Sequence, residues 1–145
     1  MNWKDNLLES RQQIKELLAQ TKTIAVVGIK TEAQSFQPAF YVPQYLASAG
    51  FEVIPVPVYY PEATEILGAK VYRRLADIPV EIDLANIFRR SADVAGHLED
   101  ILTKRPRAVW MQSGIYNKEV AETLAKEGIK VVQNACLMVE HRMLR

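Results

Sequence analysis

Cysteine, histidine and long apolar runs are all scarce in this sequence of 145 residues. Its one cysteine, Cys136, cannot form an intramolecular disulfide, which is typical of a protein kept in a reducing compartment. No apolar run approaches the roughly 20 residues of a membrane-spanning helix, and the polar segment of residues 1–20 lacks the apolar core of a signal peptide. These absences predict a cytoplasmic protein that does not associate with membranes.

Excess charge of either sign is also missing. The sequence has 18 lysines and arginines against 17 aspartates and glutamates, and its formal net charge is +1. A general nucleic-acid-binding protein needs a basic surface, so this composition argues against that class. Hydrophobic residues make up 49% and charged residues 24%, which is typical of a folded globular protein. The length fits one domain, which we predict to span residues 1–145.

Short apolar runs alternate with segments of helical periodicity along the chain. The runs predict strands at residues 23–28, 51–56, 82–88, 107–112 and 130–133, with a short strand or extended piece at 69–72 after a loop at 58–67. The periodic segments predict helices at residues 5–20, 38–49, 91–104, 118–127 and 135–144. Parallel strands need crossover connections, so the alternation predicts an α/β fold, a doubly wound parallel sheet of about five strands with flanking helices. The N-terminal helix within residues 1–21 is expected to pack on it.

Ligands of such folds bind outside the carboxyl ends of the strands. That rule selects four segments of this chain, namely residues 28–37, 56–59, 88–91 and 112–116. In the first, Gly28 allows a sharp turn and the close approach of a ligand, and the start of the next helix favours an anion. Lys30 adds a positive charge, while Thr31 and Ser35 add hydroxyl groups. A phosphate site and a plain strand-to-helix turn both remain open for this loop.

The known glycine-rich phosphate loops do not match this segment. Residues 28–33 contain one glycine instead of the three of the dinucleotide fingerprint, and no Gly-Lys-Ser/Thr of a P-loop follows. An NAD site also needs a carboxylate near the end of the second strand, where the first one here is Glu62. Val56 and Pro57 instead predict a flat apolar wall suited to an adenine ring. The pattern therefore disfavours NAD.

The two remaining strand ends carry polar groups. Phe88 is followed by Arg89 and Arg90, whose planar guanidinium groups are natural partners of phosphate, although a solvated charged turn is the alternative. The fourth strand ends in Gln112, Ser113 and Gly114, which offer an amide, a hydroxyl and a close backbone approach, unless they form only a tight turn. The pair Arg73 and Arg74 lies outside these ends and is expected on the surface.

No arrangement of side chains in the sequence compels a reaction. His97 falls in the middle of the helix predicted for residues 91–104, where we expect it to face away from the strand ends, and His141 falls in the last predicted helix. Ser113 lacks the Gly-x-Ser-x-Gly context of a nucleophile. Cys136 lacks metal-ligand spacing, and we expect a buried structural cysteine, with a reactive thiol as the alternative. The sequence therefore predicts no catalytic residue and no metal.

Several segments together resemble a known family. They occur in this order along the chain: Ile24-Ala25-Val26-Val27-Gly28, Val53-Ile54-Pro55-Val56, Ile66-Leu67-Gly68, Leu75-Ala76-Asp77-Ile78-Pro79, Phe88-Arg89-Arg90, Trp110-Met111-Gln112-Ser113-Gly114-Ile115 and Cys136-Leu137-Met138-Val139-Glu140-His141. Over about residues 5–145, the chain resembles the small stand-alone CoA-binding proteins. Those proteins look like the N-terminal CoA-binding domain of the succinyl-CoA synthetase α subunit. Gln37 departs from the arginine that is common before the proline in that family.

The resemblance implies a Rossmann-like fold that binds coenzyme A across the strand ends, with the ADP part over the first loop and the wall of the second strand. By position, it implies binding at Gly28, Ile29, Lys30, Val56, Pro57, Phe88, Arg89, Gln112, Ser113, Gly114 and Ile115. The predicted function is non-catalytic binding of CoA or acyl-CoA. Two alternatives stay open: an accessory subunit of an acyl-CoA ligase or nucleotide-dependent transferase, and an NAD-type sensing domain.

Overall fold

The computed structural model describes residues 2–144 of the chain. Its strands are β1 (Thr23–Val27), β2 (Glu52–Val56), β3 (Glu65–Ile66), β4 (Ala69–Lys70), β5 (Leu84–Ile87), β6 (Ala108–Met111) and β7 (Lys130–Val132). The α-helices are α1 (Arg11–Ala19), α2 (Pro38–Ser48), α3 (Leu98–Lys104), α4 (Lys118–Lys126) and α5 (Leu137–Met143). Short 3-10 helices lie at η1 (Trp3–Asn6), η2 (Glu32–Gln34), η3 (Leu75–Asp77) and η4 (Ser91–His97). Within residues 2–144, no helix is long and apolar enough to cross a membrane.

The main sheet has five strands in the order β2-β1-β5-β6-β7, and every neighbouring pair is parallel. This arrangement confirms the predicted Rossmann-like α/β fold. The chain moves from β1 outward to β2 and then returns to the other side of β1 to form β5. The order of the strands therefore reverses between β1 and β5, and that reversal marks where a ligand site is expected.

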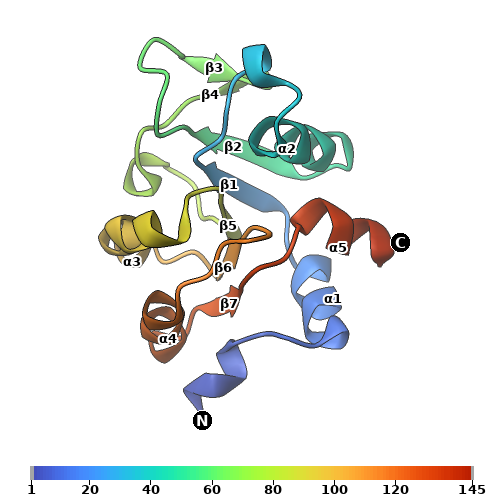
Figure 1. The fold of residues 1–145 in the computed structure, drawn as a ribbon, viewed down its shortest axis with the longest axis vertical. Helices are drawn as coiled ribbons and strands as arrows, with labels where there is room; N and C mark the ends of the chain where they lie inside the picture. The colour runs from blue at the N-terminus through green and yellow to red at the C-terminus, as the bar shows by residue number, and fades with distance from the viewer. Residues whose placement is uncertain (1, 145) are drawn as a thin grey trace.

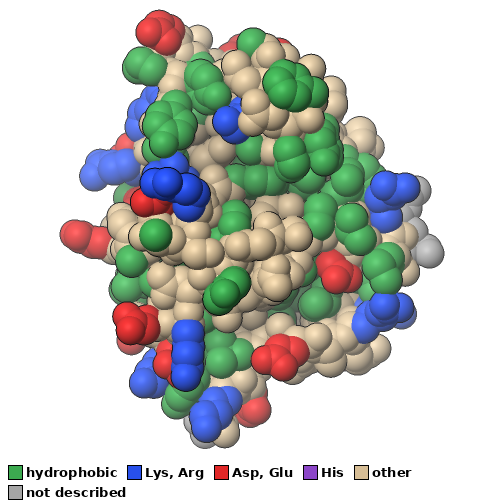
Figure 2. Space-filling model, in the orientation of Figure 1, with side chains coloured by type: hydrophobic (Ala, Val, Ile, Leu, Met, Phe, Trp, Pro, Cys, Tyr) green, Lys and Arg blue, Asp and Glu red, His purple; other side chains and the backbone are tan. Residues whose placement is uncertain are grey.

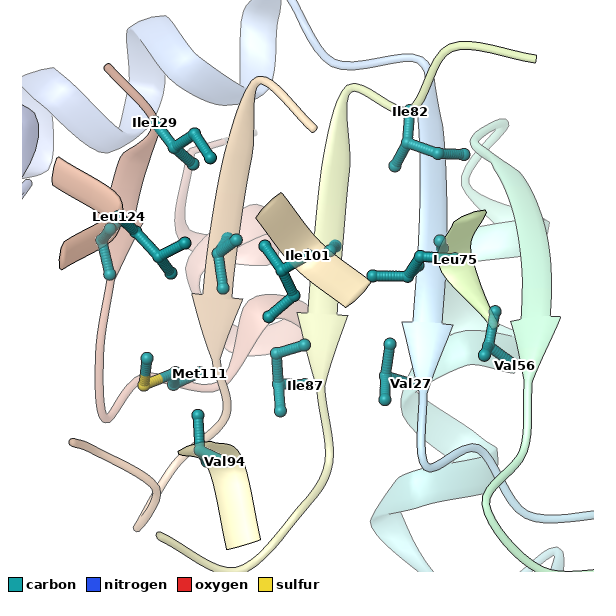
Figure 3. Close-up of a cluster of buried hydrophobic side chains, with 14 of the residues drawn as sticks. Val27, Val56, Leu75, Ile82, Ile87, Val94, Ile101, Met111, Leu124 and Ile129 are labelled. Carbon is teal, nitrogen blue, oxygen red and sulfur yellow. The ribbon is translucent and has the colours of Figure 1, made fainter. Parts of the chain in front are cut away.

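Two apolar clusters cover the two faces of this sheet. Along β1, Ile24 and Val26 point into one cluster while Ala25 and Val27 point into the other, since successive side chains of a strand alternate. Helices α3 and α4 cover one face and α1, α2 and α5 cover the other (Figure 1). Figure 3 shows the first cluster, in which Val27, Val56 and Ile87 stand on strands that run in one direction. Burial on both faces explains the continuous apolar runs of these strands.

The N-terminal segment differs from the single helix predicted for residues 5–20. After η1, Leu7 forms a parallel bridge with Val131 of β7, and the N–H of Leu8 donates to the carbonyl of Val131. Helix α1 begins only at Arg11, because Ser10 and Gln13 form a reciprocal capping box that starts a new helix there. The first half of the segment therefore shields the free edge of β7, while α1 packs into the second cluster.

A hairpin of β3 and β4 replaces the end of the predicted loop at residues 58–67. Its two-residue turn, Leu67 and Gly68, has positive φ at both positions, as the favoured hairpin turns require. The strained Leu67 is stabilised because its N–H donates to the Glu32 carboxylate at 2.8 Å. The hairpin therefore supports the loop that follows β1 (Figure 1).

The helix predicted for residues 91–104 is divided into the 3-10 helix η4 and the α-helix α3. Ser91 does not cap it, since Arg90 occupies the N-cap position without a capping side-chain bond. The hydroxyl of Ser91 instead accepts a hydrogen bond from the N–H of Tyr116, at 3.1 Å. This bond joins the segment after β5 to the segment after β6.

Candidate functional site

The carboxyl ends of β1, β5 and β6 meet at an open groove with a volume of ≈ 460 Å³. Its lining residues come from three loops and the start of α2: Lys30, Gln37, Pro38, Ala39, Phe88, Arg89, Arg90, Ser91, Gly114 and Ile115. On the face shown in Figure 2, lysine and arginine side chains lie beside exposed hydrophobic ones. The groove lies at the reversal of strand order between β1 and β5, where the fold predicts a ligand.

Gly28 lets β1 and β5 approach each other at the base of the groove. Its φ is +87°, and a Cβ atom at this position would lie 2.2 Å from the carbonyl oxygen of Phe88. The same Cβ would lie 3.3 Å from Cδ of Arg89. The glycine is thus required by the backbone of the neighbouring strand, whereas the sequence suggested that it makes room for a ligand.

The residues after Gly28 have different surroundings. Ile29 is 1% exposed and packs into the second cluster, so only its backbone lies near the groove. Thr31 forms a capping box with Gln34 at the start of η2, and its hydroxyl donates to the Gln34 side chain at 2.8 Å. Ser35 is exposed and does not line the groove. Of the side chains predicted from this loop, that of Lys30 is the one that lines the groove.

Lys30 lies beside the start of α2. Its backbone N–H donates to the carbonyl of Ala39 at 3.1 Å, which ties the loop to the helix. Within residues 2–144, its ammonium group has no ion-pair or hydrogen-bond partner. Gln37 is the N-cap of α2 but makes no capping bond, and Pro38 occupies the first helical position. A free cation and a helix N-terminus therefore face the same groove.

Arg89 is held in place on several sides. Its Nε donates to Nε2 of His97 at 3.1 Å, and its guanidinium lies 3.8 Å from the carboxylate of Asp93. The guanidinium carbon lies 5.7 Å from the centroid of the Tyr59 ring, within the range of a cation–π contact. The side chain is 17% exposed, so these contacts fix its direction at the groove wall.

Arg90 is far less constrained than its neighbour. Its side chain is 86% exposed, and its Nε donates to the Asp93 carboxylate at 2.9 Å. This hydrogen bond is the main reason that the pKa of Asp93 is lowered from its ordinary value, so the carboxylate stays charged. Asp93 therefore lies within ion-pair distance of both Arg89 and Arg90 and offsets part of their positive charge.

The end of β2 lies next to β1 but does not line the groove. Val56 and Pro57 are buried, and the carbonyl of Val56 accepts a hydrogen bond from the N–H of Gly28 at 2.9 Å. Tyr59, which follows them, is 62% exposed. Arg73 donates to the carbonyls of Tyr59 and Tyr60, so this exposed arginine shapes the loop from the surface. The Tyr59 ring is thus more exposed than Val58, the other exposed apolar side chain at this strand end.

The predicted residues at the end of β6 differ in burial and in whether they line the groove. Gln112 is 4% exposed, and its Oε1 accepts hydrogen bonds from the Leu137 N–H at 3.0 Å and from Asn86 at 3.3 Å. Ser113 is exposed but does not line the groove. Gly114 and Ile115 do line it, and the N–H of Gly114 is held by the Asn134 side chain. Gln112 thus faces the interior with its carbonyl oxygen.

The positions of His97 and Cys136 differ from those expected from the sequence. His97 was expected to face away from the strand ends, but it contacts Arg89 at the groove. His141 lies at a distance, where its Nδ1 is 2.7 Å from the Tyr45 hydroxyl. Cys136 is half-buried at the N-cap of α5 and packs against the second cluster. Residues 2–144 contain no cluster of histidine, cysteine and acidic residues that suits a metal ion.

Reasoning from the sequence found the strand ends but missed part of the groove wall. Lys30, Phe88, Arg89, Arg90, Gly114 and Ile115 were predicted and line it. Pro38 and Ala39 also line it and lie outside the selected segments, while Gln37 and Ser91 lie inside them but were not predicted as binding residues. The proline at the expected start of the second helix was the available signal, because a helix that begins beside the first strand end must present its first turn to the same groove.

The fold and groove define a class of protein: a Rossmann-like α/β protein with a cationic groove at the carboxyl edge of its parallel sheet. The family model described as CoA binding domain matches residues 22–142. The chain belongs to this CoA-binding family, which confirms the resemblance seen in its sequence. The match begins after α1 and covers the whole main sheet.

Several relatives support this membership. The chain is 34% identical over 136 residues to the uncharacterized protein YneT of Bacillus subtilis (strain 168), covering 94% of this chain and 97% of that protein. A solved structure from Thermus thermophilus is 37% identical with a TM-score of 0.86, covering 94% of this chain and all of the other. A hypothetical protein from Pyrococcus horikoshii OT3 is 31% identical with a TM-score of 0.83, covering 94% and 92%.

A larger protein contains a similar fold. Acetyl-coenzyme A synthetase 1 of Ca. Korarchaeum cryptofilum, solved in complex with phosphate and ADP, is 27% identical with a TM-score of 0.64. The similarity covers 80% of this chain but 26% of the synthetase chain. This chain is thus similar to one part of a much longer synthetase.

Proposed function

We propose that this protein binds coenzyme A, or an acyl-CoA, in the groove at the carboxyl ends of β1, β5 and β6. The observation that carries the proposal is the convergence of Lys30, Arg89 and Arg90 with the start of α2 on one groove. Membership of a CoA-binding family supports the choice of ligand. Charge-assisted hydrogen bonds to phosphate are among the strongest that a protein makes, so this groove favours an anionic ligand.

The ligand's chemistry is matched by the distribution of groups in the groove. In our proposal the phosphates lie between Lys30, the N-terminus of α2 and Arg89, where the positive charge is concentrated. The pantetheine arm follows the apolar wall of Phe88, Pro38 and Ile115. The adenine ring lies against the end of β2, where the Tyr59 ring is exposed and follows the buried Pro57.

We further propose that the protein performs no reaction on this ligand. The ionisable side chains that line the groove are Lys30, Arg89 and Arg90, all cations at neutral pH. General acid–base catalysis works best with a group that titrates near the operating pH, which arginine does not do. Several predicted binding residues do not line the groove, and in our proposal they contact the ligand through their backbones or after movement of the loops: Gly28, Ile29, Thr31, Ser35, Val56, Pro57, Gln112 and Ser113.

The second candidate function is that of an accessory subunit of an acyl-CoA ligase, and the similarity to a synthetase favours this candidate. Such a subunit would bind CoA in the same groove. A pull-down that recovers ligase-like subunits would distinguish it from a protein that acts alone. An NAD-type sensing domain is less well supported because β2 ends without a carboxylate near the groove, and Glu62 lies in the exposed turn beyond it. Tighter binding of NADH than of CoA in a thermal-shift comparison would favour it.

Calorimetric titration with CoA tests the main proposal. We expect saturable binding at sub-millimolar CoA by the wild-type protein. Lys30→Ala and Arg89→Gln should each weaken it by about 1.5–3 kcal/mol, the range for hydrogen bonds to charged groups. The matched controls are Lys22→Ala and Arg107→Gln, which alter exposed cations at the amino ends of β1 and β6. These controls should leave the affinity unchanged.

The outcomes separate the ligand from its location. A folded wild-type protein that shows no heat of binding at millimolar CoA would remove CoA as the ligand. Equal losses in the groove variants and in the controls would show that CoA binds through general charge attraction. Losses confined to the controls would place the ligand at the opposite edge of the sheet.

A further inference from the structure

The hydrogen bond between Arg89 and His97 joins the groove wall to the end of η4. Arg89 follows β5, His97 is the last residue of η4, and the donor–acceptor distance is 3.1 Å. His97 is not among the residues that line the groove, so it stands behind Arg89 as seen from the groove. The contact therefore acts on the direction of the guanidinium.

This contact defines the protonation state of the histidine. A guanidinium group has donors and no acceptor, so Nε2 of His97 must accept and cannot carry a proton. The ring is therefore neutral, with its proton on Nδ1. A protonated ring would place two donors face to face and a second positive charge beside Arg89.

Three charged side chains act on His97, and each comes from a different segment of the chain. Arg89 lies after β5, Asp93 lies in η4 and Asp100 lies in α3. Burial is the main cause that lowers the pKa of His97 from its ordinary value, and the charge of Arg89 adds to it, while Asp100 and Asp93 act in the opposite direction. Both carboxylates have other partners: Asp93 accepts from Arg90, and Asp100 caps the N–H groups of Leu75 and Ala76.

We propose that neutral His97 is a positioning residue that aims the Arg89 guanidinium at the phosphates of the bound ligand. The Nε of Arg89 is occupied by the histidine, which fixes the plane of the guanidinium while the side chain lines the groove. The Tyr59 ring lies against the guanidinium at 5.7 Å, and Asp93 balances its charge from a distance of 3.8 Å. An arginine held in this way loses less side-chain entropy when it binds phosphate.

This inference rests on the proposed function, because it assigns to His97 a role in anion binding at the same groove. Its test is a double-mutant cycle of His97→Leu and Arg89→Gln, with His97→Gln as the conservative variant that keeps an acceptor near the position of Nε2. Affinity is measured for CoA and, separately, for inorganic pyrophosphate. Thermal unfolding monitors the folding of every variant.

We expect His97→Leu to weaken binding of both ligands about five- to tenfold, which corresponds to the loss of one hydrogen bond. His97→Gln should restore affinity to within about twofold, since its amide oxygen also accepts from Arg89. In the Arg89→Gln background, His97→Leu should have no further effect, because residues that act through one contact are not additive. Long-range proton–nitrogen spectra of the free protein should show the proton on Nδ1.

Additive losses in the cycle would overturn the positioning role, as would wild-type affinity in His97→Leu or a proton on Nε2 in the free protein. Failure of the wild-type protein to bind CoA would overturn the proposed function instead. The pyrophosphate titrations still decide the present inference in that case, because they need only an anion at Arg89.

Discussion

Replacing Gly28 with alanine tests the close approach of β1 and β5 on which the groove depends. The added Cβ would lie 2.2 Å from the carbonyl oxygen of Phe88, and the backbone at this position has a φ of +87°. The left-handed conformation costs a residue with a side chain about 1–2 kcal/mol. Forcing an extra carbon into a packed site typically costs about 1–3 kcal/mol more. The two effects together predict a loss of about 2–5 kcal/mol in the free energy of unfolding.

Gly128→Ala is the matched control for this change. Gly128 has a φ of +83°, close to that of Gly28, but a Cβ there would have no atom within 4 Å. The difference between the two variants in urea unfolding therefore isolates the steric contact with Phe88 from the backbone strain. Equal losses in the two variants would refute the reasoning, because they would show that β5 does not press against Gly28. We also expect weaker CoA binding in Gly28→Ala alone, since the new Cβ would lie 3.3 Å from Cδ of Arg89.

Three further predictions concern groups around the groove and beneath it. Burial lowers the pKa of His97 below its ordinary value of 6.5, so the unfolded chain binds more protons than the folded one at pH values between the two. The free energy of unfolding should therefore rise with pH through the window that ends near pH 6.5. Urea unfolding on both sides of pH 6.5 should show a smaller rise in His97→Gln. Gln112→Leu should lower the free energy of unfolding by about 1–3 kcal/mol, because the buried Leu137 N–H loses its acceptor. An unchanged midpoint of urea unfolding would contradict this. Trp110→Phe removes the donor to the Ala135 carbonyl at 2.7 Å and should lower stability by a similar amount in the same assay, whereas Trp3→Phe, outside the core, should not.

The main sheet could be predicted because its strands are buried on both faces. A strand such as β1 shows no alternation of polar and apolar residues, and a short, continuous apolar run is the direct consequence of that burial. The starts of two helices were less well predicted, because α1 begins at Arg11 and α3 at Leu98 instead of at residues 5 and 91. Ser10 starts α1 through its bond to the N–H of Gln13, whereas Ser91 bonds instead to Tyr116, which is distant in sequence. The same residue type thus had different partners, which local sequence does not reveal.

The β3–β4 hairpin shows why some local structure escaped prediction. Leu67 adopts a positive φ that leucine rarely takes, and its N–H is bonded to Glu32, 35 residues earlier in the chain. The turn is therefore stabilised by a tertiary contact that a local pattern cannot contain. Gly68 alone was the visible signal, and it is compatible with many kinds of loop.

The position of the groove followed from the strand order, but the direction of single side chains did not. The sequence predicted a regular α-helix over this segment. In such a helix His97, six residues after Ser91, lies about one and two-thirds turns further along and therefore on the other side of the helix. In the 3-10 helix that forms there, three residues make a turn, so six residues return to the same side. Ser91 lines the groove, and His97 consequently lies on the side of Arg89.

A structure of the protein determined with CoA tests the central claim most directly. The account predicts that the phosphates of CoA lie within hydrogen-bonding distance of the Lys30 ammonium and the Arg89 guanidinium, beside the first turn of α2. It also predicts that the bond from Arg89 to His97 is kept in the complex. Density for CoA outside the groove that is lined by these residues, or in the groove with its phosphates remote from both cations, would contradict the account.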